Sequence, residues 1–286
     1  MAPQKTVSRR LGINLALAAL VAVLLWVVFL KPEAPSGKTQ YPLSSLAATG
    51  IDEITIAPAN RPQIVLARRQ GDWFVTQPFS ARADMSHVEG LLGLLSAQSA
   101  QRLAAQDLAR FGLDKPLARV RVGTQEFTFG GTQPLTDQLY VLTQGAVYLI
   151  SPVYFVDVAK QPSDYLSKQL FDDKDVPVAF AFPRFTLTRQ AGQWRMTPAN
   201  GLRSQDDANA FADEWRHAMA LSVAPEAMPK SAEAVTITFQ SGKAVNVQAV
   251  PGKDEWVLRR GDTGLAYHFM PQAAQRLLEP AFAPKQ

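Results

Sequence analysis

Three histidines, His87, His217 and His268, are the side chains best suited to acid–base chemistry or metal binding near neutral pH. The sequence contains neither H-x-x-x-H nor H-E-x-x-H, the spacings that place two ligands on one face of a helix. We expect His87 in the first turn of a helix, His217 on a solvated helix surface and His268 in a strand. The histidines therefore predict no metal site.

The acidic run Asp172, Asp173 and Asp175 brings three carboxylates close together, which could hold a calcium ion. The run lacks the spacing, the glycine and the final glutamate of an EF-hand loop, so a solvated charge run is the favoured interpretation. The segment SGKT at 36–39 is similar to the end of a phosphate-binding loop, but Pro32 stands where the first glycine is needed. No G-x-S-x-G elbow is present, and a triad assembled in space is left open by the sequence. We predict no catalytic, no cofactor-binding and no metal-binding residue.

The chain of 286 residues has no cysteine, which excludes disulfides, zinc–thiolate sites, iron–sulfur clusters and cysteine nucleophiles. Its charge is concentrated at one end. Residues 1–30 contain Lys5, Arg9 and Arg10 and no acidic side chain, whereas basic and acidic side chains nearly balance in the rest. A nearly neutral remainder argues against a surface that follows nucleic-acid phosphates.

The segment 11–30 contains 20 residues without a charge, long enough for a helix to cross a hydrocarbon core. Trp26 lies near its end, where an interfacial aromatic is expected. The basic residues before it predict a cytoplasmic N-terminus and an extracytoplasmic remainder, hence a single-pass signal-anchor in the bacterial inner membrane. A cleaved signal peptide is the alternative, and the bulky end of the run and its length disfavour it.

Two segments 121 residues apart resemble each other, each centred on a tryptophan. The matched positions are Leu66, Arg68, Gly71, Trp73 and Thr76 in one and Leu187, Arg189, Gly192, Trp194 and Thr197 in the other. Each copy alternates apolar and polar residues around a glycine, which predicts a β-hairpin. We expect both tryptophans to be core residues; stacking platforms for a glycan or peptide are the alternative.

Helical periodicity follows each hairpin. Val88, Leu91, Leu92 and Leu95 share one face, with Asp84 or Ser86 as the cap. In the second copy, Ser204 is the expected cap and the apolar face is made by Ala208, Phe211, Ala212, Trp215 and Met219. Two more alternating hairpins come next in each copy, and then a helix that starts at Pro152 or at Pro271.

We therefore predict an α+β fold: an N-terminal single transmembrane helix followed by a duplicated ββ-α-ββ-ββ-α unit with mainly antiparallel sheets. The expected parts are a cytoplasmic tail at 1–10, the transmembrane helix at 11–30, a linker at 31–50, the first repeat at 51–162, a polar connector at 163–175 and the second repeat at 176–286.

Short motifs also occur in a fixed order after Trp73 and Pro78. They are FGLDKP at 111–116, GGTQP at 130–134 and Tyr140-Val141. This order resembles a family of uncharacterised bacterial envelope domains found beside gliding-motility-type ABC transporter components. The resemblance implies a membrane-anchored extracytoplasmic domain without established catalysis and supplies no catalytic residues. From the residues themselves, Gly112 is expected in a left-handed conformation after a helix, and GGTQP is expected to form a turn.

Two functions of different classes remain open. The first is a non-catalytic, inner-membrane-anchored accessory protein that contacts a membrane complex, with ABC transporter subunits as expected partners and no cofactor. The alternative is an extracytoplasmic binding module or hydrolase that acts on cell-wall glycan or peptide in a cleft between the two halves. A pocket with a perturbed carboxylate or histidine would favour the second function. An apolar patch rimmed by polar residues would favour the first.

Overall fold

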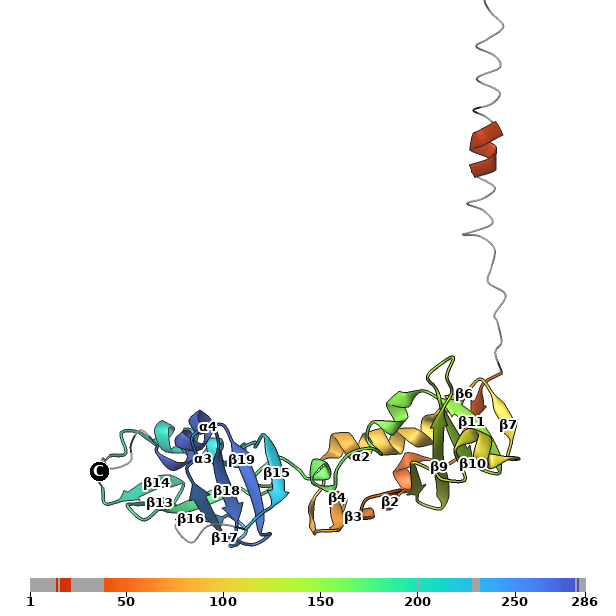
Figure 1. Ribbon diagram of the computed structural model, residues 1–286. Coiled ribbons are helices and arrows are strands. Elements are labelled where there is room, and N and C mark those ends of the chain that lie inside the picture. The colour runs from red at the N-terminus through yellow and green to blue at the C-terminus, as the bar shows by residue number, and fades with distance from the viewer. Residues whose placement is uncertain are drawn as a thin grey trace, which may run out of the picture. The chain divides into compact units, whose positions relative to one another are not determined.

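Strict alternation of apolar and polar side chains produces most of the strands. In the segment ARVRV at 118–122, the alanine and both valines are buried and both arginines are exposed. The computed structural model describes residues 14, 16–21, 39–199, 201–227, 232–280 and 282. Contacts group Tyr41–Gln286 into one unit, in which Figure 1 shows the two large sheets as two lobes.

The first large sheet contains nine strands, all antiparallel to their neighbours, in the order β5-β4-β3-β2-β8-β9-β10-β11-β7. Their bounds are β2 Glu53–Pro58, β3 Ile64–Arg69, β4 Asp72–Gln77, β5 Ala81–Arg82, β7 Arg102–Ala104, β8 Ala118–Val122, β9 Gln125–Thr132, β10 Leu139–Thr143 and β11 Ala146–Ile150. A separate two-stranded sheet pairs β1 (Tyr41–Pro42) with β6 (Gln98–Ser99).

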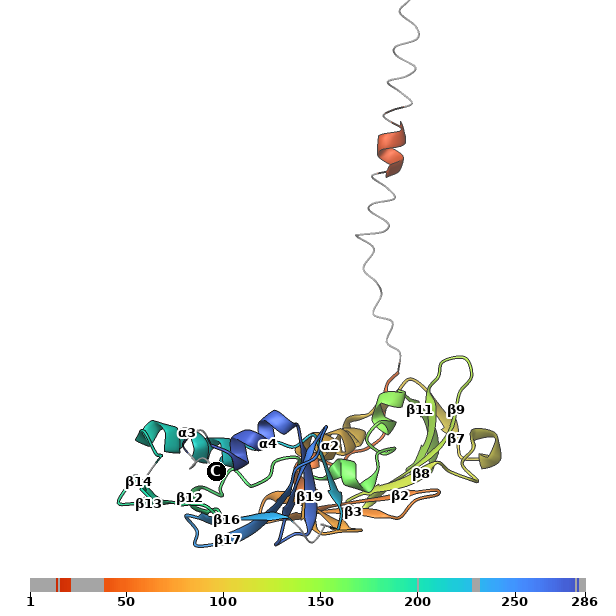
Figure 2. The same ribbon diagram turned by 60° about the vertical axis from the view of Figure 1, so that its left-hand side comes forward.

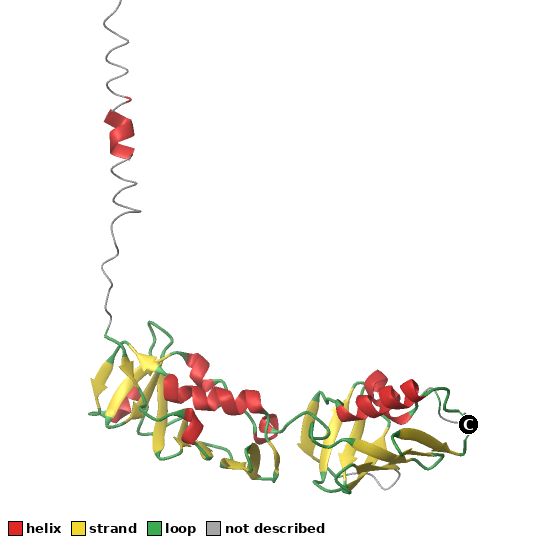
Figure 3. Cartoon of the chain, turned by 180° about the vertical axis from the view of Figure 1, so that it is seen from behind, coloured by secondary structure: helices red, strands yellow, loops and turns green. Residues whose placement is uncertain are grey.

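The second large sheet contains eight antiparallel strands in the order β14-β13-β12-β16-β17-β18-β19-β15. Their bounds are β12 Pro177–Ala181, β13 Thr186–Gln190, β14 Gln193–Thr197, β15 Ser222–Pro225, β16 Glu233–Phe239, β17 Ala244–Val250, β18 Trp256–Arg260 and β19 Leu265–Phe269. In Figure 3 the strands of both large sheets are the yellow arrows, and the helices are red.

The helices are short. They are α2 (Met85–Leu92), α3 (Gln205–Arg216) and α4 (Pro271–Leu278), with 3-10 turns η1 Ala48–Gly50, η2 Gly93–Ser96, η3 Leu108–Phe111, η4 Pro152–Phe155 and η5 Pro162–Tyr165. Helices α3 and α4 contact each other and lie on one face of the second sheet (Figures 1 and 2). Helices α2 and α3 have the expected N-caps. The Asp84 carboxylate accepts a hydrogen bond from Ser86 N in α2, and the Ser204 hydroxyl accepts one from Asp207 N in α3.

The predicted fold class is wrong. The described chain is mostly β, with three antiparallel sheets, and the expected ββ-α-ββ-ββ-α unit is not what it forms. The unit missed β2 and β12, which add a strand to each tryptophan hairpin, and the edge strands β7 and β15. It also placed a helix at Pro152, where only a single 3-10 turn forms, whereas α4 does begin at Pro271. Edge strands of three or four residues are too short to show a recognisable alternation.

The predicted transmembrane helix at 11–30 lies outside the described residues except for Asn14 and 16–21. Over the part of the chain that the structure describes, no helix is long and apolar enough to cross a membrane. The linker expected at 31–50 is described from residue 39 onward. There, β1 pairs with β6, and Leu43 is fully buried in the core of the first sheet.

Both tryptophans of the matched hairpins are buried, so the prediction that they are core residues is confirmed. Trp194 packs beside Phe180 of β12, and its Nε1 donates to Asn209 Oδ1 at 3.0 Å. Gly112 ends η3 with a φ of 66°, the left-handed conformation that was expected. Gly130, by contrast, lies within β9 rather than in a turn. A Cβ there would lie 2.3 Å from the carbonyl oxygen of Phe111, so only glycine lets η3 approach the strand.

Candidate functional site

The connector at 163–175 begins in η5 and then hydrogen-bonds to β5 of the first sheet and to the segment just before β15 of the second. On one side, Asp84 N donates to Tyr165 O and Ser167 N donates to Arg82 O, which attaches the connector beside β5. On the other side, Leu170 N donates to Ala218 O at 2.8 Å and Ala220 N donates to Lys168 O at 2.9 Å, just before β15. The polar side chains of the connector are thereby fixed between two sheet edges.

Four apolar side chains anchor the connector in the core. Tyr165, Leu166, Leu170 and Phe171 are essentially inaccessible to solvent and belong to one hydrophobic cluster that extends through both sheets. The Phe171 ring lies 4.9 Å from that of Phe239 in β16. Burial of this kind supports a rigid segment rather than a tether, because each apolar side chain is held on several sides.

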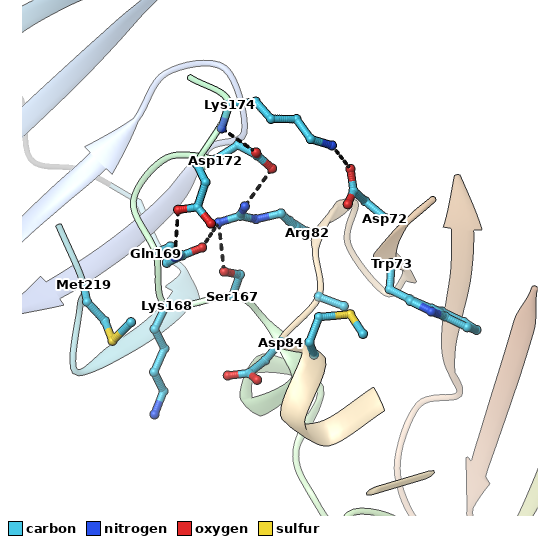
Figure 4. Close-up of a pocket in the computed structure, with 13 residues that line it drawn as sticks. Asp72, Trp73, Arg82, Asp84, Ser167, Lys168, Gln169, Asp172, Lys174 and Met219 are labelled. Atoms are coloured by element: carbon cyan, nitrogen blue, oxygen red, sulfur yellow. Dashed lines mark hydrogen bonds and ion pairs between the residues drawn. The ribbon is translucent and has the colours of Figure 1, made fainter. Parts of the chain in front are cut away.

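We call the contact between β5, the connector and the segment before β15 the junction. Arg82, the last residue of β5, makes most of its side-chain hydrogen bonds to the connector (Figure 4). Its Nη1 donates to Asp172 Oδ2 at 2.7 Å, and its Nη2 donates to Gln169 Oε1 at 2.7 Å and to Ser167 Oγ at 3.2 Å. Nη2 also donates to the carbonyl oxygen of Phe171 at 3.1 Å. A planar guanidinium suits this position because it presents several donors in a fixed geometry.

Asp172 is held ionised by this arrangement. Burial alone would raise the pKa of its carboxyl, but a hydrogen bond from Lys174 N at 2.9 Å and the Arg82 guanidinium outweigh it and lower the pKa. Lys174 then reaches back to the first sheet, where its Nζ donates to Asp72 Oδ2 at 2.8 Å. A carboxylate with a lowered pKa is a fixed negative charge and a poor proton donor at neutral pH.

A second guanidinium, Arg260 of β18, lies under the same connector. It is 9% exposed, forms a two-pronged pair with Asp262 at 2.7 and 3.0 Å, and donates to the carbonyl oxygen of Leu170 at 2.6 Å. Lys243 Nζ lies 3.0 Å from the same carboxylate. Burial raises the pKa of Asp262, but Arg260 and Lys243 outweigh it and lower the pKa to about 2.

Two hollows lie at the junction and share Arg82, Ser167, Gln169 and Asp172. The first hollow, of about 390 Å³, is further lined by Asp72, Trp73, Ala83, Asp84, Met85, Lys168, Asp173, Lys174 and Met219 (Figure 4). The second hollow, of about 520 Å³, is further lined by Arg69, Gln70, Phe74, Ser80, Ala81, Asp175, Lys243, Arg260, Asp262, Thr263 and Tyr267. Their charges differ: basic side chains number three against four acidic ones in the first hollow, and four against three in the second.

This arrangement suits binding better than proton transfer. Acid catalysis of glycoside hydrolysis needs a carboxyl whose pKa is raised, so that it carries a proton to donate. The pKa values of Asp172 and Asp262 are shifted in the opposite direction, by the hydrogen bond from Lys174 N and the Arg82 guanidinium at Asp172, and by Arg260 and Lys243 at Asp262. Burial raises the pKa of the Tyr267 phenol, which keeps that hydroxyl neutral.

The three histidines lie apart from the junction network. His87 is in the first turn of α2, and its Nδ1 is 2.7 Å from Asp157 Oδ1. His217 is exposed beside the end of α3, and His268 in β19 lies between Glu226 and Glu255 at 3.3 and 3.1 Å. Over the described ranges, no three histidine, aspartate or glutamate side chains group as a metal site requires.

The acidic run has a different role from the solvated one we expected. Asp172 is paired with Arg82, Asp173 accepts from Gln169 Nε2 at 3.3 Å, and Asp175 accepts from Asp172 N at 3.4 Å. The segment SGKT at 36–39 lies outside the described residues except for Thr39. Met219, predicted on the buried face of α3, follows the end of that helix and is 63% exposed.

Sequence reasoning missed Arg82, Arg260, Asp262 and Lys243 because no short motif unites them. Arg82 precedes a helix cap in an unremarkable segment, and its partners lie about 90 residues further along the chain. One signal was available. The connector contains Tyr165, Leu166, Leu170 and Phe171, which a solvated linker would not be expected to carry.

Searches of curated proteins and of solved structures returned no match to the chain. Residues 73–227 match a family described as a domain of unknown function, DUF4340. The matched segment contains Arg82 and the whole connector, and it accounts for more than half of the sequence. The chain belongs to the DUF4340 family.

Proposed function

We propose that this chain is a non-catalytic accessory protein that binds another protein at the bacterial inner membrane. The observation that carries the proposal is a set of four exposed apolar side chains: Met85 and Met219, which line the first hollow, and Leu221 and Met270, which lie beside β15 and β19. We call these four residues the apolar patch. Water-exposed apolar groups of this kind mark interaction surfaces more often than catalytic sites.

The four residues lie outside the strands, next to elements of both large sheets. Met85 begins α2 beside the first sheet, and Met219 lies just before β15 of the second; both line the first hollow. Leu221 N donates to His268 O in β19, and Met270 follows that strand directly. Three methionines give such a surface adaptable side chains that can fit an irregular partner.

Polar side chains border the patch. Lys168, Asp84 and Asp173 line the same hollow as the two methionines. An apolar centre with a charged border is the usual composition of a protein interface. A hydrolase has less support, because the carboxylates fixed by Arg82 and Arg260 have lowered pKa values.

The proposed location and partner rest on the sequence. Lys5, Arg9 and Arg10 precede the uncharged run at 11–30, which favours a cytoplasmic N-terminus and an extracytoplasmic remainder. The motifs shared with envelope domains found beside ABC transporter components make transporter subunits the expected partners. A C-terminal alkaline phosphatase fusion should be active if this location is correct and inactive if the C-terminus is cytoplasmic.

Partner binding is tested by affinity purification from detergent-solubilised membranes. The wild-type chain should retain transporter subunits, and Met219→Asp should lose them, because a carboxylate would have to be desolvated at the interface. Leu135→Asp is the matched control: Leu135 is 93% exposed in the β9–β10 loop and lies outside the patch. Equal recovery of transporter subunits with both variants would contradict the proposal, as would their absence from the wild-type sample.

A further inference from the structure

The second hollow carries an excess of positive charge contributed by both large sheets. Arg69 ends β3 in the first sheet, and Lys243 lies in the turn between β16 and β17 of the second. Arg82 and Arg260 complete the basic lining, against Asp172, Asp175 and Asp262. The hollow has one more basic than acidic side chain, so the ion pairs already formed determine which basic groups can bind a ligand.

The acidic side chains are already engaged. Asp172 is paired with Arg82, and Asp262 is paired with both Arg260 and Lys243. Asp175 accepts from Asp172 N. Arg69 is exposed, and within the described part of the chain it forms no ion pair and no side-chain hydrogen bond. The excess charge lies in the Arg260–Lys243–Asp262 group, where two cations share one carboxylate, and Arg69 is the basic lining residue without a carboxylate partner among the described residues.

Donor groups remain available around the hollow. Arg82 donates through Nη1 and Nη2, and within the described residues its Nε donates no hydrogen bond. A lysine ammonium has three donors, and Lys243 directs one at Asp262. Phe74 and Tyr267 supply aromatic walls, which lower the local dielectric and strengthen charge-assisted hydrogen bonds.

We infer that the second hollow binds an anionic ligand through carboxylate or phosphate oxygens, with Arg69 and Lys243 as the residues that contact it. A volume of about 520 Å³ lies within the range of small-molecule sites. The two residues come from different sheets, so the ligand bridges them. The inference goes beyond the proposed function, because the apolar patch can bind its partner whether or not this hollow is occupied.

The test is isothermal titration of the full chain, purified in mild detergent, with two probes: inorganic phosphate and the dicarboxylate glutarate. We expect saturable binding of at least one probe. Arg69→Ala should weaken that binding about tenfold, the effect of losing one charge-assisted hydrogen bond. Lys243→Gln should act in the same direction. Binding of phosphate alone would identify a phosphate ligand, and binding of glutarate alone a carboxylate ligand.

Arg119→Ala is the matched control, because Arg119 is an exposed arginine of β8 that lines neither hollow. It removes the same charge and should leave binding unchanged. Failure of both probes to bind would overturn the inference, and so would an Arg69→Ala variant with wild-type affinity or equal losses in the Arg69 and Arg119 variants. Loss of transporter subunits in Met219→Asp would be unaffected by any of these outcomes, so the two proposals fail separately.

Discussion

Both large sheets place eight strands in one order, but only the first adds a ninth strand at one edge. Strands β4-β3-β2-β8-β9-β10-β11-β7 occupy the same successive positions as β14-β13-β12-β16-β17-β18-β19-β15. The additional strand is β5, which consists of Ala81 and Arg82. Arg82, whose side chain binds the connector, therefore belongs to the strand that has no counterpart in the second sheet.

The shared part extends to individual side chains. Arg68 pairs across the strands with Trp73, and Arg189 pairs in the same way with Trp194. Both arginines donate through Nε to the carbonyl oxygen of the turn glycine, at 3.2 and 3.4 Å. Gly71 and Gly192 have φ values of 94° and 82°, so each hairpin turns through a conformation that favours glycine.

The sheets differ in what covers them. The second sheet is covered by α3 and α4, with an aromatic group formed by Phe180, Phe182, Phe185, Phe211, Trp215 and Phe282. The first sheet is covered by α2 and by 3-10 turns, and the connector closes the edge beside β5. The same strand order is thus covered by different elements in the two sheets.

The tryptophans give the largest effect with which to test this comparison. Trp73→Ala and Trp194→Ala should each lower the free energy of unfolding by about 3–5 kcal/mol, because both remove a buried aromatic side chain. Trp194→Phe should cost about 1 kcal/mol more than Trp73→Phe, since it also leaves Asn209 Oδ1 without its indole donor. Urea denaturation of the full chain measures all four variants. Equal costs for the two phenylalanine variants would show that the indole hydrogen bond does not distinguish the sheets.

The Asp262 pair gives a somewhat smaller effect, and it depends on pH. The pKa of Asp262 is lowered from 3.8 to about 2, so its ionised form stabilises the fold by about 2 kcal/mol above pH 4. That contribution should be lost as the pH falls from about 4 to about 2. Asp262→Asn removes the contribution and should flatten the stability profile in this interval. Asp254→Asn, at an exposed position of the β17–β18 loop, should retain the wild-type slope.

Arg82 tests whether the additional strand joins the two sheets. Arg82→Met should lower the free energy of unfolding by about 1–3 kcal/mol, because it leaves Asp172 half-buried without its partner. Arg82→Lys should restore little, since an ammonium cannot reach four acceptors arranged for a guanidinium. Hydrogen exchange at Ser167 N should accelerate in both variants. Full rescue by lysine would contradict the geometric argument.

The sequence predicted the local elements of this comparison well. The two tryptophan hairpins, the caps Asp84 and Ser204 and the start of α4 at Pro271 all depend on residues within a few positions of each other. Such short-range signals are visible in one sequence. The predicted fold class was wrong because the short strands β5, β7 and β15 leave almost no pattern, yet they form sheet edges.

The candidate site could not be predicted for a related reason. Arg82 and Asp172 are brought together by two sheets and a connector, and nothing in their local sequences relates one to the other. The lowered pKa values arise partly from near neighbours, Lys174 N beside Asp172 and Arg260 beside Asp262, and partly from Arg82 and Lys243, which only the tertiary structure brings close. The apolar residues of the connector did carry information, because burying them required the segment to lie between the sheets.

Substitutions at the helix caps should have the smallest effect on the free energy of unfolding. Asp84 caps the helix that follows the first tryptophan hairpin, and Ser204 caps the helix that follows the second. Ser204→Ala should cost about 1 kcal/mol, because Asp207 N loses its acceptor at the start of α3. Asp84→Ala should cost more, since Asp84 accepts from both Ser86 N and Ser86 Oγ and adds a negative charge at the start of α2. Asp84→Asn keeps a capping oxygen without the charge and should fall between Asp84→Ala and wild type. If Asp84→Asn matched wild type at low salt, the difference between the caps would come from hydrogen bonding alone, and the charge at α2 would contribute nothing measurable.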